Sequence, residues 1–200
     1  RFSEDIDLVQ IESGPIGPIF DALREVLAPI LGKPKRKQGT GIVTLMYRMS
    51  SEMPPVSPLR LKVEINSREH FALLGIHKKS FAIESPWLTS ACEVRTFALE
   101  ELLGTKLRAL YQRRKGRDLF DLWLGLTEEK ADAQKIVDCF RQYMEHAERQ
   151  VSRNEFAENL ARKRLHPGFM ADLRDLLPIV MNYNLDEGFS VLESKILPLI

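Results

Sequence analysis

The chain has 200 residues, of which 44% are hydrophobic and 28% are charged, and its formal net charge is +1. This composition excludes a disordered chain and is sufficient for a buried core in one compact domain or two small ones. No apolar run approaches the ~20 residues of a membrane-spanning helix, and the first residues lack the layout of a signal peptide. We therefore expect a cytoplasmic protein with no membrane partner.

The cysteines and the distribution of basic residues limit the possible functions further. Cys92 and Cys139 lie far apart with no metal-ligand spacing around them, which predicts reduced, buried thiols rather than a zinc site or a disulfide. The near-neutral charge also hides basic clusters at residues 33–37, 113–117 and 162–164. Such clusters are often plain solvated surface, but they also suit a phosphate-rich partner, because Lys and Arg that neutralise phosphates release counterions.

The first half of the chain is predicted to consist mostly of strands. Alternation and flanking turn residues predict strands over residues 5–11, 41–49, 60–66 and 92–97. Apolar residues at helical spacing predict one amphipathic helix from Ile16 to Ile30, which ends near Gly32. The segment 53–58 is rich in proline and is expected to be a loop, so the strands on either side of it are predicted to pair.

Helical periodicity replaces strand periodicity from Ala98 onward. Helices are predicted over residues 98–111, 119–126, 131–149, 152–164 and 185–197. Ser152 and Glu155 have the spacing of a capping box at the start of one of them. The predicted fold class is therefore α+β, with a small mixed sheet in a domain over residues 1–97 and a helical domain over residues 98–200.

Two acids stand two residues apart in the first predicted strand. Because side chains alternate along a strand, Asp5 and Asp7 share one face, whereas Ile6 and Leu8 point to the other face and are expected in the core. A plain polar strand face is the simpler explanation for such a pair taken alone. Other charged residues decide whether it belongs to a site.

The strand over residues 60–66 adds a third carboxylate. Its apolar residues Leu61, Val63 and Ile65 are expected in the core, which leaves Glu64 on the opposite face. Packed carboxylates repel one another unless a cation lies between them. Hard oxygen ligands suit Mg²⁺, which orients phosphates during in-line displacement, so Asp5, Asp7 and Glu64 are candidate metal ligands.

Further charged residues occur in the first two predicted helices of the second half. Lys106 stands among leucines, where a lysine either extends along the edge of a core or reaches a phosphate. Asp118 and Asp121 lie three residues apart on the next helix and share a face. Asp118 can equally be an acid favoured by the helix dipole at a helix start.

Four segments together resemble the AbiEii/AbiGii toxin family of nucleotidyltransferases. They are RFSEDIDL at residues 1–8, LKVEI at 61–65, ELLGTKLRAL at 101–110 and RDLFDL at 117–122. The resemblance implies a nucleotidyltransferase-like mixed sheet with flanking helices, followed by a helical bundle that completes the active-site cleft. It covers residues 1–125.

The resemblance also implies roles for particular residues. Asp5 and Asp7 would bind the catalytic metal, with Glu64 as a third ligand common in the wider superfamily. Lys106 would bind phosphate, and Asp118 would be an essential acid. Ser3, Arg108 and Asp121 are the corresponding substrate-binding candidates.

Two departures from the family pattern are visible. The glycine-containing phosphate-binding turn of the family is expected upstream of Asp5, so we expect that a preceding segment is missing from this chain. The last motif also differs, because two residues separate Lys115 from Asp118, where many relatives have lysine directly before the acid.

The function implied by the resemblance is transfer of a nucleoside monophosphate from a nucleoside triphosphate to an acceptor. The expected acceptor is RNA such as tRNA, the expected cofactor is Mg²⁺, and the expected partner is the antitoxin of a bacterial toxin–antitoxin or phage-defence pair. The basic cluster at residues 113–117 would suit RNA or the triphosphate. A non-catalytic nucleotide- or protein-binding module on the same fold is the alternative, and a small-molecule nucleotidyltransferase is a weaker one.

Overall fold

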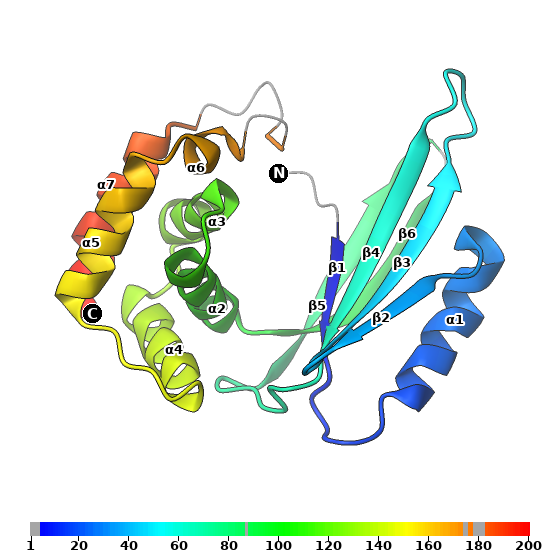
Figure 1. The fold of residues 1–200 in the computed structure, drawn as a ribbon, viewed down its shortest axis with the longest axis horizontal. Helices are drawn as coiled ribbons and strands as arrows, with labels where there is room; N and C mark the ends of the chain where they lie inside the picture. The colour runs from blue at the N-terminus through cyan, green and yellow to red at the C-terminus, as the bar shows by residue number, and fades with distance from the viewer. Residues whose placement is uncertain (1–4, 87, 174–175, 178–182) are drawn as a thin grey trace. The chain divides into compact units, whose positions relative to one another are not determined.

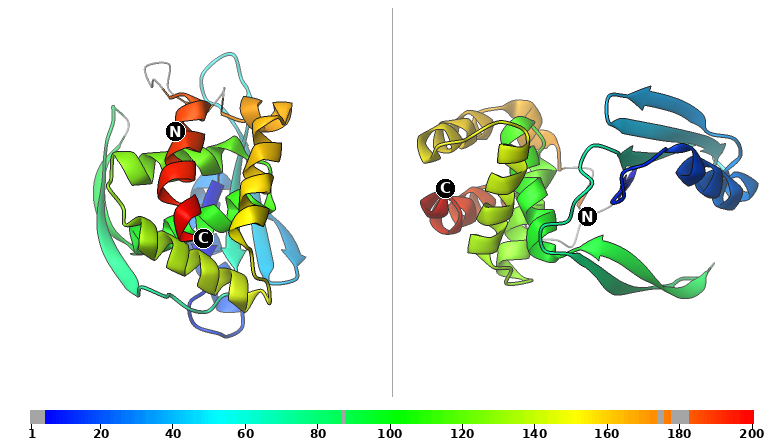
Figure 2. Two further views of the ribbon diagram at one scale, coloured as in Figure 1. Left: turned by 90° about the vertical axis from the view of Figure 1, so that its left-hand side faces the viewer. Right: turned by 90° about the horizontal axis from the view of Figure 1, so that it is seen from below.

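A computed structural model describes residues 5–86, 88–173, 176–177 and 183–200 (Figures 1 and 2). The described chain forms two compact units, residues 5–71 and Ala72–Ile200. The division differs from the predicted boundary after Phe97. The reason is that strands β5 (Ile76–Glu84) and β6 (Thr89–Phe97) pair only with each other, and so do not extend the first sheet.

The unit over residues 5–71, here called the sheet unit, contains one four-stranded sheet and one helix. Its elements are β1 (Asp5–Val9), α1 (Gly17–Leu31), β2 (Lys35–Gly39), β3 (Ile42–Ser50) and β4 (Pro58–Asn66). The strand order is β1-β4-β3-β2, with β1 parallel to β4 and the other neighbours antiparallel. The mixed sheet and the predicted pairing of the strands around the proline-rich loop are both confirmed.

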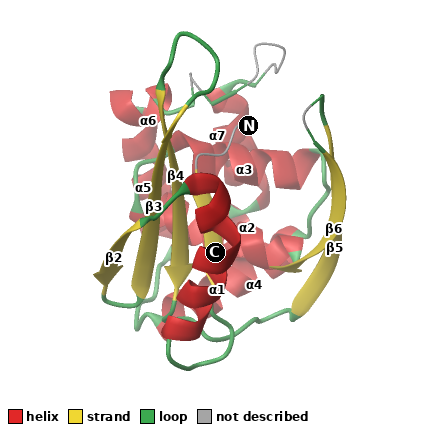
Figure 3. Ribbon diagram, turned by 90° about the vertical axis from the view of Figure 1, so that its right-hand side faces the viewer, coloured by secondary structure: helices red, strands yellow, loops and turns green. Residues whose placement is uncertain are grey.

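Helix α1 covers one face of this sheet (Figure 3). Alternate residues of β3 and β4, among them Leu45, Tyr47 and Val63, are buried against Phe20 of the helix. This placement confirms the predicted core face of β4. No helix of the described part of the sheet unit lies on the opposite face, which is called the open face below.

The prediction that Ile6 and Leu8 lie in the core is wrong. They share the helix-facing side of the sheet with Val63 and Ile65, their partners in register. Nevertheless, Ile6 is 42% exposed and Leu8 is 36% exposed, whereas Val63 is fully buried. The reason is position within the sheet, because β1 stands at its edge and the buried cluster is centred on β3, β4 and α1.

Two strands were not predicted from sequence. Strand β2 consists of the residues KRKQG and is exposed throughout, and β5 is exposed at nearly every position. Each lies at the edge of its sheet, so neither needs the apolar alternation from which strands are recognised. Charged residues on an edge strand also discourage pairing with other chains.

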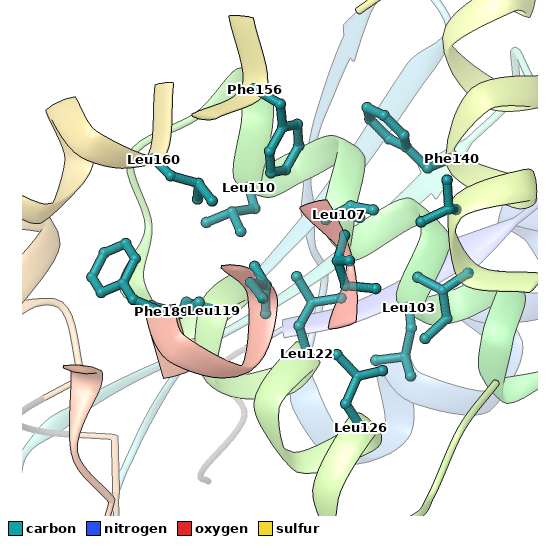
Figure 4. Packing of buried hydrophobic residues seen from close by; sticks show 14 of the residues in the cluster. Leu103, Leu107, Leu110, Leu119, Leu122, Leu126, Phe140, Phe156, Leu160 and Phe189 are labelled. Atoms are coloured by element: carbon teal, nitrogen blue, oxygen red, sulfur yellow. The ribbon is translucent and has the colours of Figure 1, made fainter. Parts of the chain in front are cut away.

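The unit Ala72–Ile200, here called the helical unit, packs its helices around one apolar core (Figure 4). The helices are α2 (Leu99–Gln112), α3 (Gly116–Thr127), α4 (Ala133–His146), α5 (Arg153–Arg164), α6 (Pro167–Ala171) and α7 (Leu185–Lys195). Leucines of α2 and α3 meet Phe140 of α4 and Phe156 of α5 in this core. The capping box of Ser152 and Glu155 is confirmed at the start of α5.

The first turn of α2 contains a fully buried carboxylate, Glu101. It accepts hydrogen bonds from the backbone N–H groups of Leu73 and Leu74 at 2.8 and 2.9 Å, and from the Tyr143 hydroxyl at 2.8 Å. A buried charge is tolerated when its lone pairs are satisfied in this way. Glu101 thus attaches the segment before β5 to helices α2 and α4.

Helix α2 approaches α4 closely at Gly104. A β-carbon at this position would lie 2.6 Å from Cβ of Cys139 and 3.1 Å from the backbone oxygen of Ile136.

Cys139 is buried as predicted, and burial raises the pKa of its thiol to about 11. Cys92 is exposed on β6, so the prediction of a buried thiol there is wrong. Within the described residues, no helix is long and apolar enough to cross a membrane.

Candidate active site

The predicted carboxylates of the sheet unit lie on one face. In the register of the parallel pair β1–β4, Asp5 stands beside Lys62 and Asp7 beside Glu64. Residues that are directly opposite in a sheet point to the same side. Asp5, Asp7, Lys62 and Glu64 therefore all project from the open face, as the alternation in sequence predicts.

Lys62 lies between two of these carboxylates. Its Nζ is 2.9 Å from Oδ2 of Asp5 and 3.1 Å from Oε2 of Glu64. Burial lowers the pKa of Lys62, but its hydrogen bonds to Asp5 and Glu64 outweigh this effect and raise the pKa overall. The ammonium thus stays charged and neutralises part of the carboxylate cluster from within the protein.

The donor chemistry at β1 fits a magnesium ion. Asp5 and Asp7 supply hard carboxylate oxygens on one face, and Mg²⁺ is commonly bound through one or two carboxylates together with waters and substrate phosphates. Among the described residues, no three acidic or other ligating side chains form a ready-made metal site. A third ligand role for Glu64 would require it to part from Lys62, and it remains a prediction.

Lys106, Asp118 and Asp121 form a second charge cluster, in the helical unit. Nζ of Lys106 is 3.2 Å from Oδ2 of Asp121 and 3.9 Å from Oδ1 of Asp118. The two acids are one turn apart on α3, and Lys106 reaches them from the neighbouring α2. The structure thus brings together three of the residues that were singled out in sequence.

Arg113 is a fourth member of this cluster. Its Nε and Nη2 each donate a hydrogen bond of 2.8 Å to the carboxylate of Asp118, in a bidentate pair. Asp118 is fully buried, whereas half of the Arg113 side chain is exposed. A planar guanidinium fork matches a carboxylate and is held in one orientation by it. Asp118 therefore fixes the orientation of the Arg113 guanidinium.

The sequence places Arg113 within a basic cluster, and the strand and helix periodicity does not indicate its partner. Arg113 ends α2 in an extended backbone conformation, and Asp118 occupies the first turn of α3. The pair forms because the short connection between the two helices folds back on itself. A search for arginines just outside a helix end, five residues from an acid, would have found it.

Most other cations of the 113–117 cluster are also paired within the protein. Nζ of Lys115 lies 3.1 Å from Asp172, and Nε of Arg117 lies 3.8 Å from the same carboxylate. Asp172 also accepts a hydrogen bond from the backbone N–H of Arg117. This internal pairing weakens the hypothesis that the loop is a general binding surface for RNA.

The remaining substrate-binding predictions stand apart from these clusters. The guanidinium of Arg108 lies over the ring of Tyr143, 4.8 Å from its centroid. Arg108 follows Lys106 by two residues, and residues two apart on a helix do not share a face, so the structure does not bring it to the cluster. Ser3 lies outside the described residues.

A mixed sheet followed by a helical bundle, with strand carboxylates on an open face, defines a fold of the nucleotidyltransferase class. The chain is similar in structure to a solved protein from H. pylori that is described as a candidate nucleotidyltransferase. The TM-score is 0.52 at 18% sequence identity, and the similarity covers 96% of this chain and 75% of that one. At this identity the similarity establishes the fold.

A sequence comparison with protein families is more specific. The family described as "Nucleotidyl transferase AbiEii toxin, Type IV TA system" matches residues 1–191. The chain therefore belongs to the AbiEii family of nucleotidyltransferase toxins, which act in type IV toxin–antitoxin systems, and the family implies a cognate antitoxin as partner. Comparison with curated proteins finds no match.

Proposed function

We propose that this chain catalyses magnesium-dependent transfer of a nucleoside monophosphate from a nucleoside triphosphate to an RNA acceptor such as tRNA. Pyrophosphate leaves in the reaction. The observation that carries the proposal is the buried Asp118, which holds the half-exposed Arg113 and lies beside Lys106. Two cations ordered by a buried acid form a preorganised site for phosphate oxygens.

Each unit contributes one part of the chemistry. In the sheet unit, Asp5 and Asp7 would hold the metal. The ion, when bound, neutralises charge on the triphosphate and on the attacking and leaving oxygens. In the helical unit, Lys106 and Arg113 bind phosphate oxygens. Asp118 is a positioning residue for Arg113, and Asp121 keeps the Lys106 ammonium in place through their 3.2 Å contact.

The alternative function is a non-catalytic module that binds a nucleotide or a protein on the same fold. One observation favours it. Lys62 already bridges Asp5 and Glu64, which supplies an internal cation where the enzyme would need a metal. In the enzyme this lysine must be displaced or must share Asp5 with the ion, whereas a module can keep it.

The two functions are separated by one assay with the cognate reaction components. The protein is incubated with Mg²⁺, labelled nucleoside triphosphates and total tRNA, and label on RNA is measured. The enzyme predicts labelled RNA that is lost with excess EDTA and in Asp5→Asn and Lys106→Met. The module predicts no label, together with nucleotide binding that survives EDTA.

Matched controls exclude loss of structure as the cause. Asp21→Asn changes an exposed acid of α1 in the sheet unit, and Lys135→Met changes an exposed lysine of α4 in the helical unit. Both variants should label RNA at the rate of the native protein. Labelling that persists in Asp5→Asn at the native rate would contradict the proposed metal role.

A further inference from the structure

The open face of the sheet carries cations as well as carboxylates. The register places Lys35 of β2 in one row with Met46, Lys62 and Asp5. It places Lys37 in the next row with Thr44, Glu64 and Asp7. The acids and Lys62 thus lie on β1 and β4, whereas Lys35 and Lys37 lie on β2 at the other edge of this face.

Two arginines continue the same face toward the end of β3 and the start of β4. Arg48 of β3 stands directly opposite Arg60 of β4, and both are exposed. A hollow of about 480 Å³ at this end of the sheet is lined by both arginines and Pro58, and also by Met49 and Leu59 from the helix-facing side. Like charges directly opposite each other in a sheet are destabilising, so folding alone does not account for this pair.

The four cations Lys35, Lys37, Arg48 and Arg60, called the basic track below, differ from the cations Arg113, Lys115 and Arg117 between α2 and α3. No member of the basic track forms an ion pair with the acids in the described part of the chain. By contrast, Arg113, Lys115 and Arg117 each contact a carboxylate. The basic track therefore keeps its full charge available for an external anion.

We propose that the basic track binds the phosphodiester backbone of the RNA acceptor, across the open face from Asp5 and Asp7. The proposal rests on the proposed function for the identity of the polyanion. The track would give the sheet unit a contact with the acceptor, in addition to the phosphate-binding role proposed for Lys106 and Arg113. It also orients the acceptor strand relative to the carboxylates of β1.

The spread of the charges favours a chain of phosphates over a single triphosphate. Neighbouring strands lie about 4.8 Å apart, and alternate residues along a strand lie about 7 Å apart. Lys35 and Lys62 are separated by β3, and Arg60 precedes Lys62 by two residues. Lys37 stands in the row of Thr44, four residues before Arg48, so the track extends roughly 10 Å across the strands and about 14 Å along them, which suits phosphates that follow one another along a strand.

The test measures binding of labelled total tRNA without nucleotide or magnesium. The variant Lys35→Ala, Lys37→Ala, Arg48→Ala, Arg60→Ala is compared with the native protein over a range of salt concentrations. Each lost phosphate contact on a single strand flattens the slope of log K against log salt by about 0.7. We expect a slope shallower by about 3 and at least tenfold weaker binding at low salt.

Arg36 supplies a control on the same strand. It lies between the two lysines of β2 but on the opposite face, where its guanidinium sits 4.2 Å from the centroid of the Phe20 ring. If the open face binds RNA, Arg36→Ala leaves the salt slope unchanged, whereas Lys35→Ala and Lys37→Ala each flatten it. Equal effects of all three would show that only the local charge of β2 matters, and would overturn the proposal.

A second control removes the same charge elsewhere. Lys135, Arg149, Arg153 and Arg162 are exposed in the helical unit, and their fourfold replacement by Ala should leave the slope close to native. A native slope in the track variant would also overturn the proposal, as would a loss of triphosphate binding with RNA binding intact. Failure of the proposed function is seen separately, as absence of RNA labelling by the native protein with nucleotide and Mg²⁺.

Discussion

The open face of the sheet unit and the loop between α2 and α3 use the same residue types in opposite ways. On the sheet, Arg48 and Arg60 stand exposed and face each other. In the helical unit, Arg113 is held by the fully buried Asp118. The presence of an arginine in the sequence therefore does not reveal whether its charge is available to a ligand or neutralised within the protein. The position of the nearest carboxylate decides that.

The largest effect is expected from the most deeply buried acid. Glu101→Ala removes the acceptor for the backbone N–H groups of Leu73 and Leu74 and for the Tyr143 hydroxyl. Because buried donors left without a partner each cost about 1–3 kcal/mol, we expect a loss of about 4 kcal/mol in the free energy of unfolding. Urea denaturation followed by circular dichroism measures it.

Glu158 on α5 provides the control for this prediction. It is exposed, so Glu158→Ala should change the free energy of unfolding by less than about 0.5 kcal/mol. A similar small change for Glu101→Ala would mean that the buried carboxylate does not attach the segment before β5 to the helices.

The second effect concerns activity. Asp118→Asn replaces the carboxylate that fixes Arg113 by a group that cannot accept both donors of the guanidinium fork. Because misplacing a positioning group commonly costs about 100-fold in rate, we expect RNA labelling to fall by at least that factor. Arg113→Lys keeps the charge but loses the fork, and should show a comparable loss.

A substitution at Asp172 tests whether activity depends on the orientation of Arg113 or on the conformation of the whole loop between α2 and α3. Asp172→Asn removes the carboxylate partner of Lys115 and Arg117 but leaves the Asp118–Arg113 pair intact. We expect labelling to fall by less than about tenfold in this variant. Equal losses in Asp118→Asn and Asp172→Asn would show that the loop as a whole, rather than Arg113, is required.

The third effect is a pH dependence that arises from a buried lysine in the last turn of α5. Lys163 is almost fully buried and donates hydrogen bonds to the Tyr111 backbone oxygen, at 3.1 Å, and to the Asn159 side chain. Burial and, to a smaller extent, the nearby charges of Arg114 and Arg162 lower the pKa of Lys163 to about 8. Asp118 acts in the opposite direction.

The sign of the pH effect follows from the lowered pKa. Between pH 8 and about 10.4 the unfolded chain still binds the proton that the folded protein has released, so stability rises with pH in this window. From pH 7 to pH 9 the native protein should gain about 1 kcal/mol relative to Lys163→Met. Urea denaturation of both proteins at the two pH values measures the difference. An equal change in the free energy of unfolding of the native protein and of Lys163→Met would contradict the lowered pKa.

The smallest expected effect is on stability and concerns the exposed arginines of the open face. Arg60→Gln removes one of the two facing arginines of the open face. Because like charges directly opposite each other in a sheet are destabilising, the free energy of unfolding should stay the same or rise by up to about 0.5 kcal/mol. A loss of more than about 1 kcal/mol would show that Arg60 stabilises the fold, and would remove one reason to regard it as a ligand-binding residue.

Much of the fold and part of the site follow from local patterns. The alternation in β1 and β4 predicts that Asp5, Asp7 and Glu64 share one face, and the structure places them so. Helical periodicity predicts α2 and α3, and their crossing brings Lys106 to Asp121. These inferences hold because the side a residue faces is set by the period of its own strand or helix.

Other features depend on contacts that no local pattern encodes. The pairing of Asp118 with Arg113, the bridge of Lys62 between Asp5 and Glu64, and the exposure of Ile6 arise from neighbouring elements. Strand β2 exists because it pairs with β3, although its own residues are charged and exposed. The sequence by itself determined which residues share a face. The tertiary structure decided which charges are neutralised, because that depends on how neighbouring elements and connections place one side chain against another, as for Asp5 with Lys62 and Asp172 with Lys115.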